Sequence, residues 1–171
     1  MMNIKAERGF SMIELLVAVL VMGIGVLGIT GLQMVSLQNN RGALVRAEAV
    51  QLAYDMLDRV RANPGSNYGG LALAAPPTAA TNCHANACTA AEMVTFDQTV
   101  WKCSLGNWNS DATCVAFRDG IILPPAANQP GLPSGDGQIA FNAGTGIVTI
   151  TVQWQEANQP NPTSISIDSQ G

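Results

Sequence analysis

The chain has 171 residues, of which 12% are charged, and a formal net charge of −4. This length suits one domain together with an anchor. Six basic and eleven acidic side chains lie beyond residue 9, a balance that gives no electrostatic footprint for nucleic acid, so no nucleic-acid partner is expected.

The first forty residues combine a short basic leader with a long uncharged stretch. Lys5 and Arg8 precede Gly9-Phe10, a single acid follows at Glu14, and residues 15–40 carry no charge. A stretch of this length predicts a membrane-spanning helix. A carboxylate at the start of such a span is costly to bury unless it is paired, so Glu14 is a candidate functional residue.

Two other targeting segments fit this stretch less well. A secretory signal has about 7–15 apolar residues and a small-residue cleavage site, whereas this stretch is longer and no A-x-A site closes it. A plain signal anchor explains the length but neither the Gly-Phe pair nor the acid. The positive-inside rule places Lys5 and Arg8 in the cytoplasm, and Arg41 and Arg46 on the other flank weaken that assignment.

Four cysteines, all downstream of the span, favour export of the remaining chain. An even count in an exported segment predicts two disulfides. Of the three possible connectivities we favour Cys83–Cys88 with Cys103–Cys114, because each closes a short local loop. Zinc is the alternative, but the spacing lacks the C-x2-C pairs of common zinc modules. The lone His84 fits a loop better than a ligand set.

A glycine pattern within the span imitates a nucleotide-binding motif. The segment from Gly23 to Gly28 matches G-x-G-x-x-G, which needs a preceding strand and a helix start beneath a pyrophosphate. Inside an uninterrupted apolar run no phosphate can lie there, so the match is fortuitous. Small residues at these positions and at Gly31 fit close helix packing in a membrane.

Helical periodicity continues to residue 62. Apolar residues at spacings of three and four form one stripe, made of Val45, Ala49, Leu52, Met56 and Val60. Asn63-Pro64 ends the helix, since the residue before proline avoids the helical region. A continuous helix from Phe10 to Ala62 spans about 80 Å. Only its first part fits in lipid, so the stripe must pack on a soluble domain.

A second, shorter helix is predicted after a surface loop over residues 65–86, which is rich in Gly, Ala, Pro and Asn. Thr89-Ala-Ala-Glu92 is a capping box that opens a helix over residues 90–103. The segment between Cys103 and Cys114 is expected to be a loop. Glycines and prolines preclude long elements over residues 120–137.

The last third predicts a β-sheet. Residues 138–141 and 146–155 flank a hairpin signal at residues 142–145, and residues 164–168 can supply a third strand. Apolar and polar side chains alternate in the second strand, so one face is buried and the other is wet. An antiparallel sheet packed on the long helix gives an α+β fold.

These features resemble the type IV pilin superfamily. Gly9-Phe10-Ser11-Met12-Ile13-Glu14 resembles the class III leader of type IV pilins and pseudopilins. The segments from Gly25 to Gln33 and from Ala53 to Pro64 resemble PilV-type minor pilins, over residues 1–64 in all and more loosely beyond. The resemblance implies a leader at 1–9, a transmembrane and assembly helix at 10–35, and a periplasmic head at 36–171.

The resemblance also implies how the chain is processed. In this family a dedicated prepilin peptidase cuts after the glycine, here between Gly9 and Phe10, and the new α-amine of Phe10 is methylated. Glu14 is then the residue implied in filament assembly. Family filaments often unwind part of this helix, but the proline that many members carry near the position of Gly31 is absent here.

Little in the sequence indicates catalysis. There is one histidine and no P-loop, nucleophile elbow or HExxH, so neither an enzyme nor a cofactor is expected. Asp136, between two glycines, fits a turn better than a calcium site. The charged residues of the long helix fit either ion pairs between subunits or a solvated face, namely Asp55, Asp58, Arg59 and Arg61. Of Trp101, Trp108 and Trp154, at least two are expected in the core.

The expected function is that of a minor type IV pilin that takes part in initiating pilus assembly. Its expected partners are other major and minor pilins, prepilin peptidase, the pilus assembly platform and the inner membrane, and its final place is the pilus. Two alternatives remain, a pseudopilin of a type II secretion system and a signal-anchored periplasmic binding module. The segment from Asp58 to Pro64 favours the pilus, and Glu14 disfavours the binding module.

Overall fold

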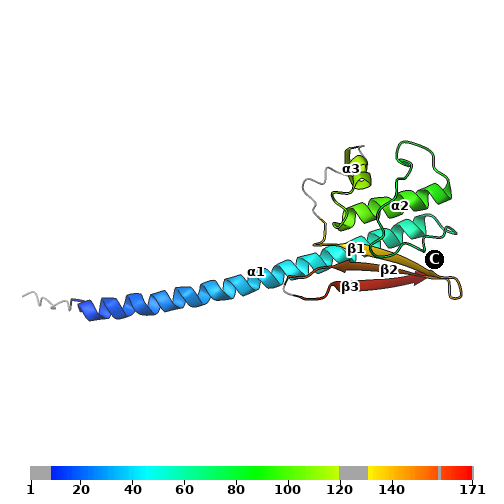
Figure 1. Cartoon of the computed structure of the whole chain (residues 1–171). Helices are drawn as coiled ribbons and strands as arrows, with labels where there is room; N and C mark the ends of the chain where they lie inside the picture. Colours follow the sequence, from blue (N-terminus) through cyan, green and yellow to red (C-terminus); the bar gives the residue numbers. More distant parts are fainter. Residues whose placement is uncertain (1–8, 120–130, 158, 171) are drawn as a thin grey trace, which may run out of the picture. The chain divides into compact units, whose positions relative to one another are not determined.

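The computed structural model describes residues 9–119, 131–157 and 159–170 (Figure 1). The chain divides into two compact units, Met1–Ala43 and Leu44–Gly171, and we call the second unit the head. Helix α1 (Met12–Ala62) contributes to both units. The leader before Gly9 and most of the glycine- and proline-rich segment expected over residues 120–137 lie outside the described residues.

The remaining elements among the described residues belong to the head. They are α2 (Ala90–Leu105), α3 (Ala112–Asp119), β1 (Asp136–Asn142), β2 (Ile147–Trp154) and β3 (Thr163–Gln170). The helices precede the strands along the chain, and this order gives the α+β fold expected from the sequence.

In the first unit, α1 exposes apolar side chains on every side. Those between Met12 and Leu37 are 55–85% exposed. By length and composition, α1 is the one candidate membrane span among the described residues. A helix that is apolar on all sides has no polar face to turn toward water, so it needs lipid or other apolar helices around it.

The head contains a three-stranded antiparallel sheet in the order β1-β2-β3 (Figure 1). Ile150 of β2 lies opposite Ile139 of β1 and Ile167 of β3. Along β2, buried and half-buried residues alternate, as the period of a pleated strand requires. The predicted hairpin and third strand are confirmed, and an isolated bridge from Leu71 to Ile139 adds a pairing on the outer side of β1.

The core lies between the sheet, α2 and the part of α1 that belongs to the head. The buried face of α1 consists of Ala49, Ala53, Met56, Leu57 and Val60. These side chains form one cluster with Trp101 and Leu105 of α2 and with Ile150 and Trp154 of β2. Trp101 also donates its indole N–H to the carbonyl of Leu52 at 2.8 Å. The predicted stripe of α1 therefore holds both α2 and the sheet.

Helix α3 corrects the sequence analysis, which expected a loop as far as Cys114. Asp111 caps this helix, because its Oδ1 accepts the N–H of Thr113 at 2.8 Å and its carbonyl accepts the N–H of Val115 at 2.9 Å. Phe117 of α3 then packs with Phe96 and Val100 of α2 in a second, smaller cluster. The helix is therefore fixed by a cap and by aromatic packing.

Gly137 marks the place where β1 passes closest to α2. A Cβ on Gly137 would lie 2.3 Å from Trp101 Cη2 and 2.8 Å from Leu105 Cδ1. Overpacking of a core typically costs about 1–3 kcal/mol. We expect Gly137→Ala to lower the free energy of unfolding by this amount or more, measured by near-ultraviolet circular dichroism of the full chain in detergent.

Gly42→Ala is the matched control, because a Cβ at this helical position meets nothing within 4 Å. Alanine also favours a helix over glycine, so this variant should unfold no earlier than the parent. Equal destabilisation of the two variants would contradict the close approach at Gly137.

Candidate functional site

The residues expected to serve cleavage and assembly lie at the N-terminal end of α1. Gly9 and Phe10 precede the helix, and Phe10 is 79% exposed. The carbonyl of Ser11 accepts the N–H groups of Glu14 at 3.0 Å and Leu15 at 3.3 Å, so helical hydrogen bonding begins after the Gly9–Phe10 bond. Glu14 stands in the first turn, where the helix dipole favours a carboxylate.

Within the described residues, the Glu14 carboxylate has no cationic partner. The ion pairs among those residues all lie in the head. A carboxylate in an apolar segment is stable in lipid only when it reaches water or a cation. A partner for a buried Glu14 must therefore come from outside the described part of this chain.

The head contains a buried ion pair that was not predicted from the sequence. Lys102 of α2 is fully buried, and its Nζ lies 2.6 Å from Asp136 Oδ1 and donates to the carbonyl of Ala72 at 3.0 Å. Asp136, the first residue of β1, also accepts the N–H of Ala74 at 2.6 Å and that of Gly137 at 2.8 Å. One pair of charges thus joins α2, β1 and the loop after α1.

The surroundings of this pair determine its protonation. Burial lowers the pKa of Lys102, because it disfavours the ammonium form, and the contact with Asp136 offsets this only in part. Burial also raises the pKa of Asp136, but the hydrogen bonds from Lys102, Ala74 and Gly137 outweigh it, and the net pKa lies below the usual value. Asp136 is therefore an ionised partner of Lys102 rather than a turn residue or a calcium ligand.

A second polar network joins the end of α1 to α2. Arg59 contacts Asp55 and Asp97, with N–O distances of 3.0 Å in both cases, and Asp97 accepts the hydroxyl of Tyr68 at 2.7 Å. Burial and this hydrogen bond raise the pKa of Tyr68. For Arg59 the structure corrects the two earlier interpretations, an ion pair between subunits and a solvated face, because its partners lie within the head.

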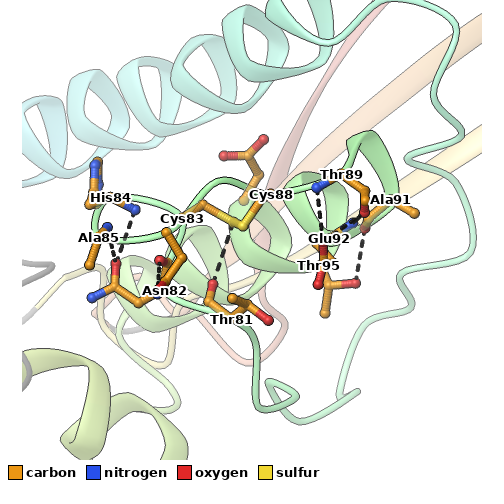
Figure 2. Close-up of a disulfide and its surroundings, with 12 residues drawn as sticks. Thr81, Asn82, Cys83, His84, Ala85, Cys88, Thr89, Ala91, Glu92 and Thr95 are labelled. Atoms are coloured by element: carbon orange, nitrogen blue, oxygen red, sulfur yellow. Dashed lines mark hydrogen bonds between the residues drawn. A yellow bond between two sulfur atoms is a disulfide. The ribbon is translucent and has the colours of Figure 1, made fainter.

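The structure pairs the four cysteines in sequence order. The Cα–Cα distances are 5.5 Å for Cys83–Cys88 and 5.2 Å for Cys103–Cys114. Figure 2 shows the first disulfide beside the start of α2, where Thr89 and Glu92 form the predicted capping box through reciprocal bonds of 2.8 and 3.3 Å. This disulfide therefore closes the loop immediately before the helix cap.

His84 has a packing role in the same loop. Its ring meets that of Phe96 edge-on, with 5.3 Å between centroids, and Asn82 accepts its backbone N–H at 3.0 Å (Figure 2). In the parts of the chain that the structure covers, no group of three or more His, Cys, Asp or Glu side chains could hold a metal ion.

Comparison with known families agrees with this architecture. A model of the prokaryotic N-terminal methylation motif matches residues 4–30, and a model described as type IV pilin Tt1218 matches residues 31–99. No curated protein and no solved structure matches the chain significantly. The motif, the apolar helix and the small antiparallel sheet define a pilin. The chain belongs to the type IV pilin superfamily, whose members are structural subunits.

The buried pair predicts a specific pattern of stabilities. Removing one partner leaves the other buried without compensation, at a cost of about 3–5 kcal/mol. We expect Lys102→Met and Asp136→Asn each to lower the free energy of unfolding in urea by this amount. The double variant should lose less than the sum, because it leaves no unpaired charge.

The control is the exposed pair Asp58–Arg61, with an N–O distance of 3.6 Å. Exposed pairs contribute about 0–1 kcal/mol, so Asp58→Asn and Arg61→Met should have little effect. Fully additive losses at residues 102 and 136 would show that the two side chains do not interact as described.

Proposed function

We propose that this pilin is a minor subunit of PilV type, which takes part in initiating assembly of a type IV pilus. The observation that carries the proposal is the first part of α1, which is exposed and apolar on every side and contains the Glu14 carboxylate, for which the described residues supply no cationic partner. Such a helix requires other apolar helices or lipid around it. The resemblance of residues 53–64 to PilV-type pilins supports the minor role.

The same proposal places the chain in the inner membrane before assembly. Lys5 and Arg8 hold the leader in the cytoplasm, where prepilin peptidase cuts between Gly9 and Phe10 and the α-amine of Phe10 is methylated. The head then lies in the periplasm, where its disulfides form. The mature chain joins major and minor pilins at the assembly platform and enters the pilus, with the tip as the place that a role in initiation favours.

Glu14 supplies the contact that selects neighbouring pilins. In the membrane-inserted monomer its carboxylate reaches the cytoplasmic headgroups. In a filament that water is absent, so the carboxylate needs a cation at close range. The α-amine of Phe10 on an adjoining subunit is the partner of suitable chemistry, because cleavage creates it and methylation leaves it able to carry a charge.

The second candidate is a pseudopilin of a type II secretion system. The methylation motif over residues 4–30 supports it equally, since pseudopilins resemble pilins in leader and anchor. Deletion of the gene distinguishes the two functions. Loss of surface pili and twitching with normal exoprotein release is the expected result, and the reverse pattern would replace the pilus by the secretion machine.

Processing is tested at the cleavage bond. Gly9→Val is expected to remain full length, because the peptidase must accommodate a residue without a side chain at the scissile bond. The parent chain should begin at a methylated Phe10, as measured by mass spectrometry of the purified protein. An intact Met1 or Met2 terminus on chains recovered from pili would reject the assignment.

Glu14→Val is expected to insert and to be cleaved normally, because valine removes the cost of burying a carboxylate. Recruitment should fail, since loss of one partner of a buried pair costs about 3–5 kcal/mol. The measurement combines membrane fractionation, the mass of the mature chain and co-purification with other pilins.

Glu48→Val is the matched control, because this exposed acid belongs to the part of α1 in the head. It should be recruited as the parent is. Normal recruitment of Glu14→Val would exclude the proposed pairing. If the variant failed to insert into the membrane, Glu14 would be needed for anchoring and the pairing would be rejected.

A further inference from the structure

The buried pair in the head is covered by a short loop, residues 106–111, which joins α2 to α3. Trp108 of this loop donates its indole N–H to Asp136 Oδ1 at 3.3 Å, and its ring centroid lies 6.0 Å from Lys102 Nζ. Trp108 itself is half-buried, whereas Lys102 is fully buried. Trp108 therefore separates the pair from solvent on this side, and we call residues 106–111 the covering loop.

The covering loop is attached to the segment that carries Asp136. The N–H of Asn107 donates to the carbonyl of Gly135 at 2.9 Å, and the N–H of Leu132 donates to the carbonyl of Leu105 at 2.8 Å. Along the chain, both backbone bonds lie shortly before Trp108 on one segment and before Asp136 on the other. Local opening of the covering loop would break both bonds unless another restraint held the loop in place.

A covalent restraint is present, and it adjoins the lysine. Cys103 directly follows Lys102 in α2 and is bonded to Cys114 in α3. Arg118 of α3 adds bonds to the carbonyls of Cys114, at 3.2 Å, and Asn109. The disulfide thus closes the chain segment that contains the covering loop. Such a crosslink reduces the conformational freedom of the open state.

The burial of the two cysteines indicates that their disulfide can be exchanged before the head folds but hardly afterwards. The residues Cys103 and Cys114 are only 4% and 0% exposed, so the folded head leaves a thiolate little access to their disulfide. Exchange of a disulfide requires attack by a thiolate on one of its sulfurs. Cys83 and Cys88, by contrast, are only partly buried, which leaves them open to exchange in the folded head.

We propose that the Cys103–Cys114 disulfide holds Trp108 over the Lys102–Asp136 pair, and that the folded head then buries this disulfide and protects it from reduction. We call this arrangement a redox lock. Oxidation joins the two sulfurs and releases two protons and two electrons. A protein disulfide of the thiol-oxidoreductase class accepts them and becomes a dithiol. Only after this oxidation does the covering loop stay closed over the Lys102–Asp136 pair. This holds whether the chain serves a pilus or a secretion machine.

The first test uses the parent chain, intact and in detergent micelles. It is treated with a dithiol reductant and iodoacetamide, and alkylated cysteines are located by mass spectrometry over time. Cys83 and Cys88 are expected to react first, and Cys103 and Cys114 only when urea unfolds the head. Equal rates of alkylation for the two disulfides without urea would show that the folded head does not protect Cys103–Cys114, and would overturn the proposal.

The second test compares two double variants, Cys103→Ala/Cys114→Ala and the control Cys83→Ala/Cys88→Ala. In the first, acetylation of Lys102 by acetic anhydride should be about tenfold faster than in the parent, because the covering loop opens more often. Acrylamide quenching of tryptophan fluorescence should rise with it, and Trp108→Phe should abolish that rise.

The control variant should protect Lys102 as the parent does. A head that unfolds in the first variant but not in the control also supports the lock. A Lys102 that stays protected without the Cys103–Cys114 bond would refute it, and so would equal exposure of Lys102 in the two double variants.

Discussion

The structure depends on the burial of one face of α1 in the head, while the same helix stays apolar on all sides in its first part. In the head, Ala49, Ala53 and Met56 are completely buried, and these small and flexible side chains let α2 and the sheet approach the helix. Toward the N-terminus the pattern loses its polar face altogether. A single helix therefore carries two sequence patterns, each suited to a different solvent.

Two buried polar networks of the head bind the loop between α1 and α2. The long loop between α1 and α2 has little regular structure of its own, yet the carbonyl of Ala72 and the N–H of Ala74 bind the Lys102–Asp136 pair. Tyr68, in the same loop, binds Asp97. Buried ion pairs are weak sources of net stability but demand their partners once buried. Here these buried groups hold the loop between α1 and α2 in one path, which its backbone hydrogen bonds alone would not determine.

Much of the fold could be predicted from local patterns. The period of α1, the Asn63-Pro64 stop and the Thr89–Glu92 capping box act within a few residues, and the hairpin signal at residues 142–145 does as well. Helix α3 was missed because its start depends on Asp111 as a cap in a segment otherwise rich in turn residues, and because its stability comes from Phe117 packing on α2.

The buried pair could not be predicted, since a lysine in an amphipathic helix ordinarily points to solvent. Only the tertiary fold brings Lys102 within reach of Asp136, 34 residues further along the chain. The same holds for Arg59, whose partner Asp97 lies on another helix. By contrast, Gly9, Phe10 and Glu14 could be proposed as cleavage and assembly residues from the sequence alone, because the pattern that points to them lies within one short segment of the chain.

The central claim is that this chain is a filament subunit, and the most direct measurement is quantitative peptide mass spectrometry of pili sheared from the cell surface and purified. The account predicts peptides of the head, both cysteine pairs among them, in the purified filaments at a small fraction of the major pilin. Filaments that lack the chain while the inner membrane retains all of it would contradict the account.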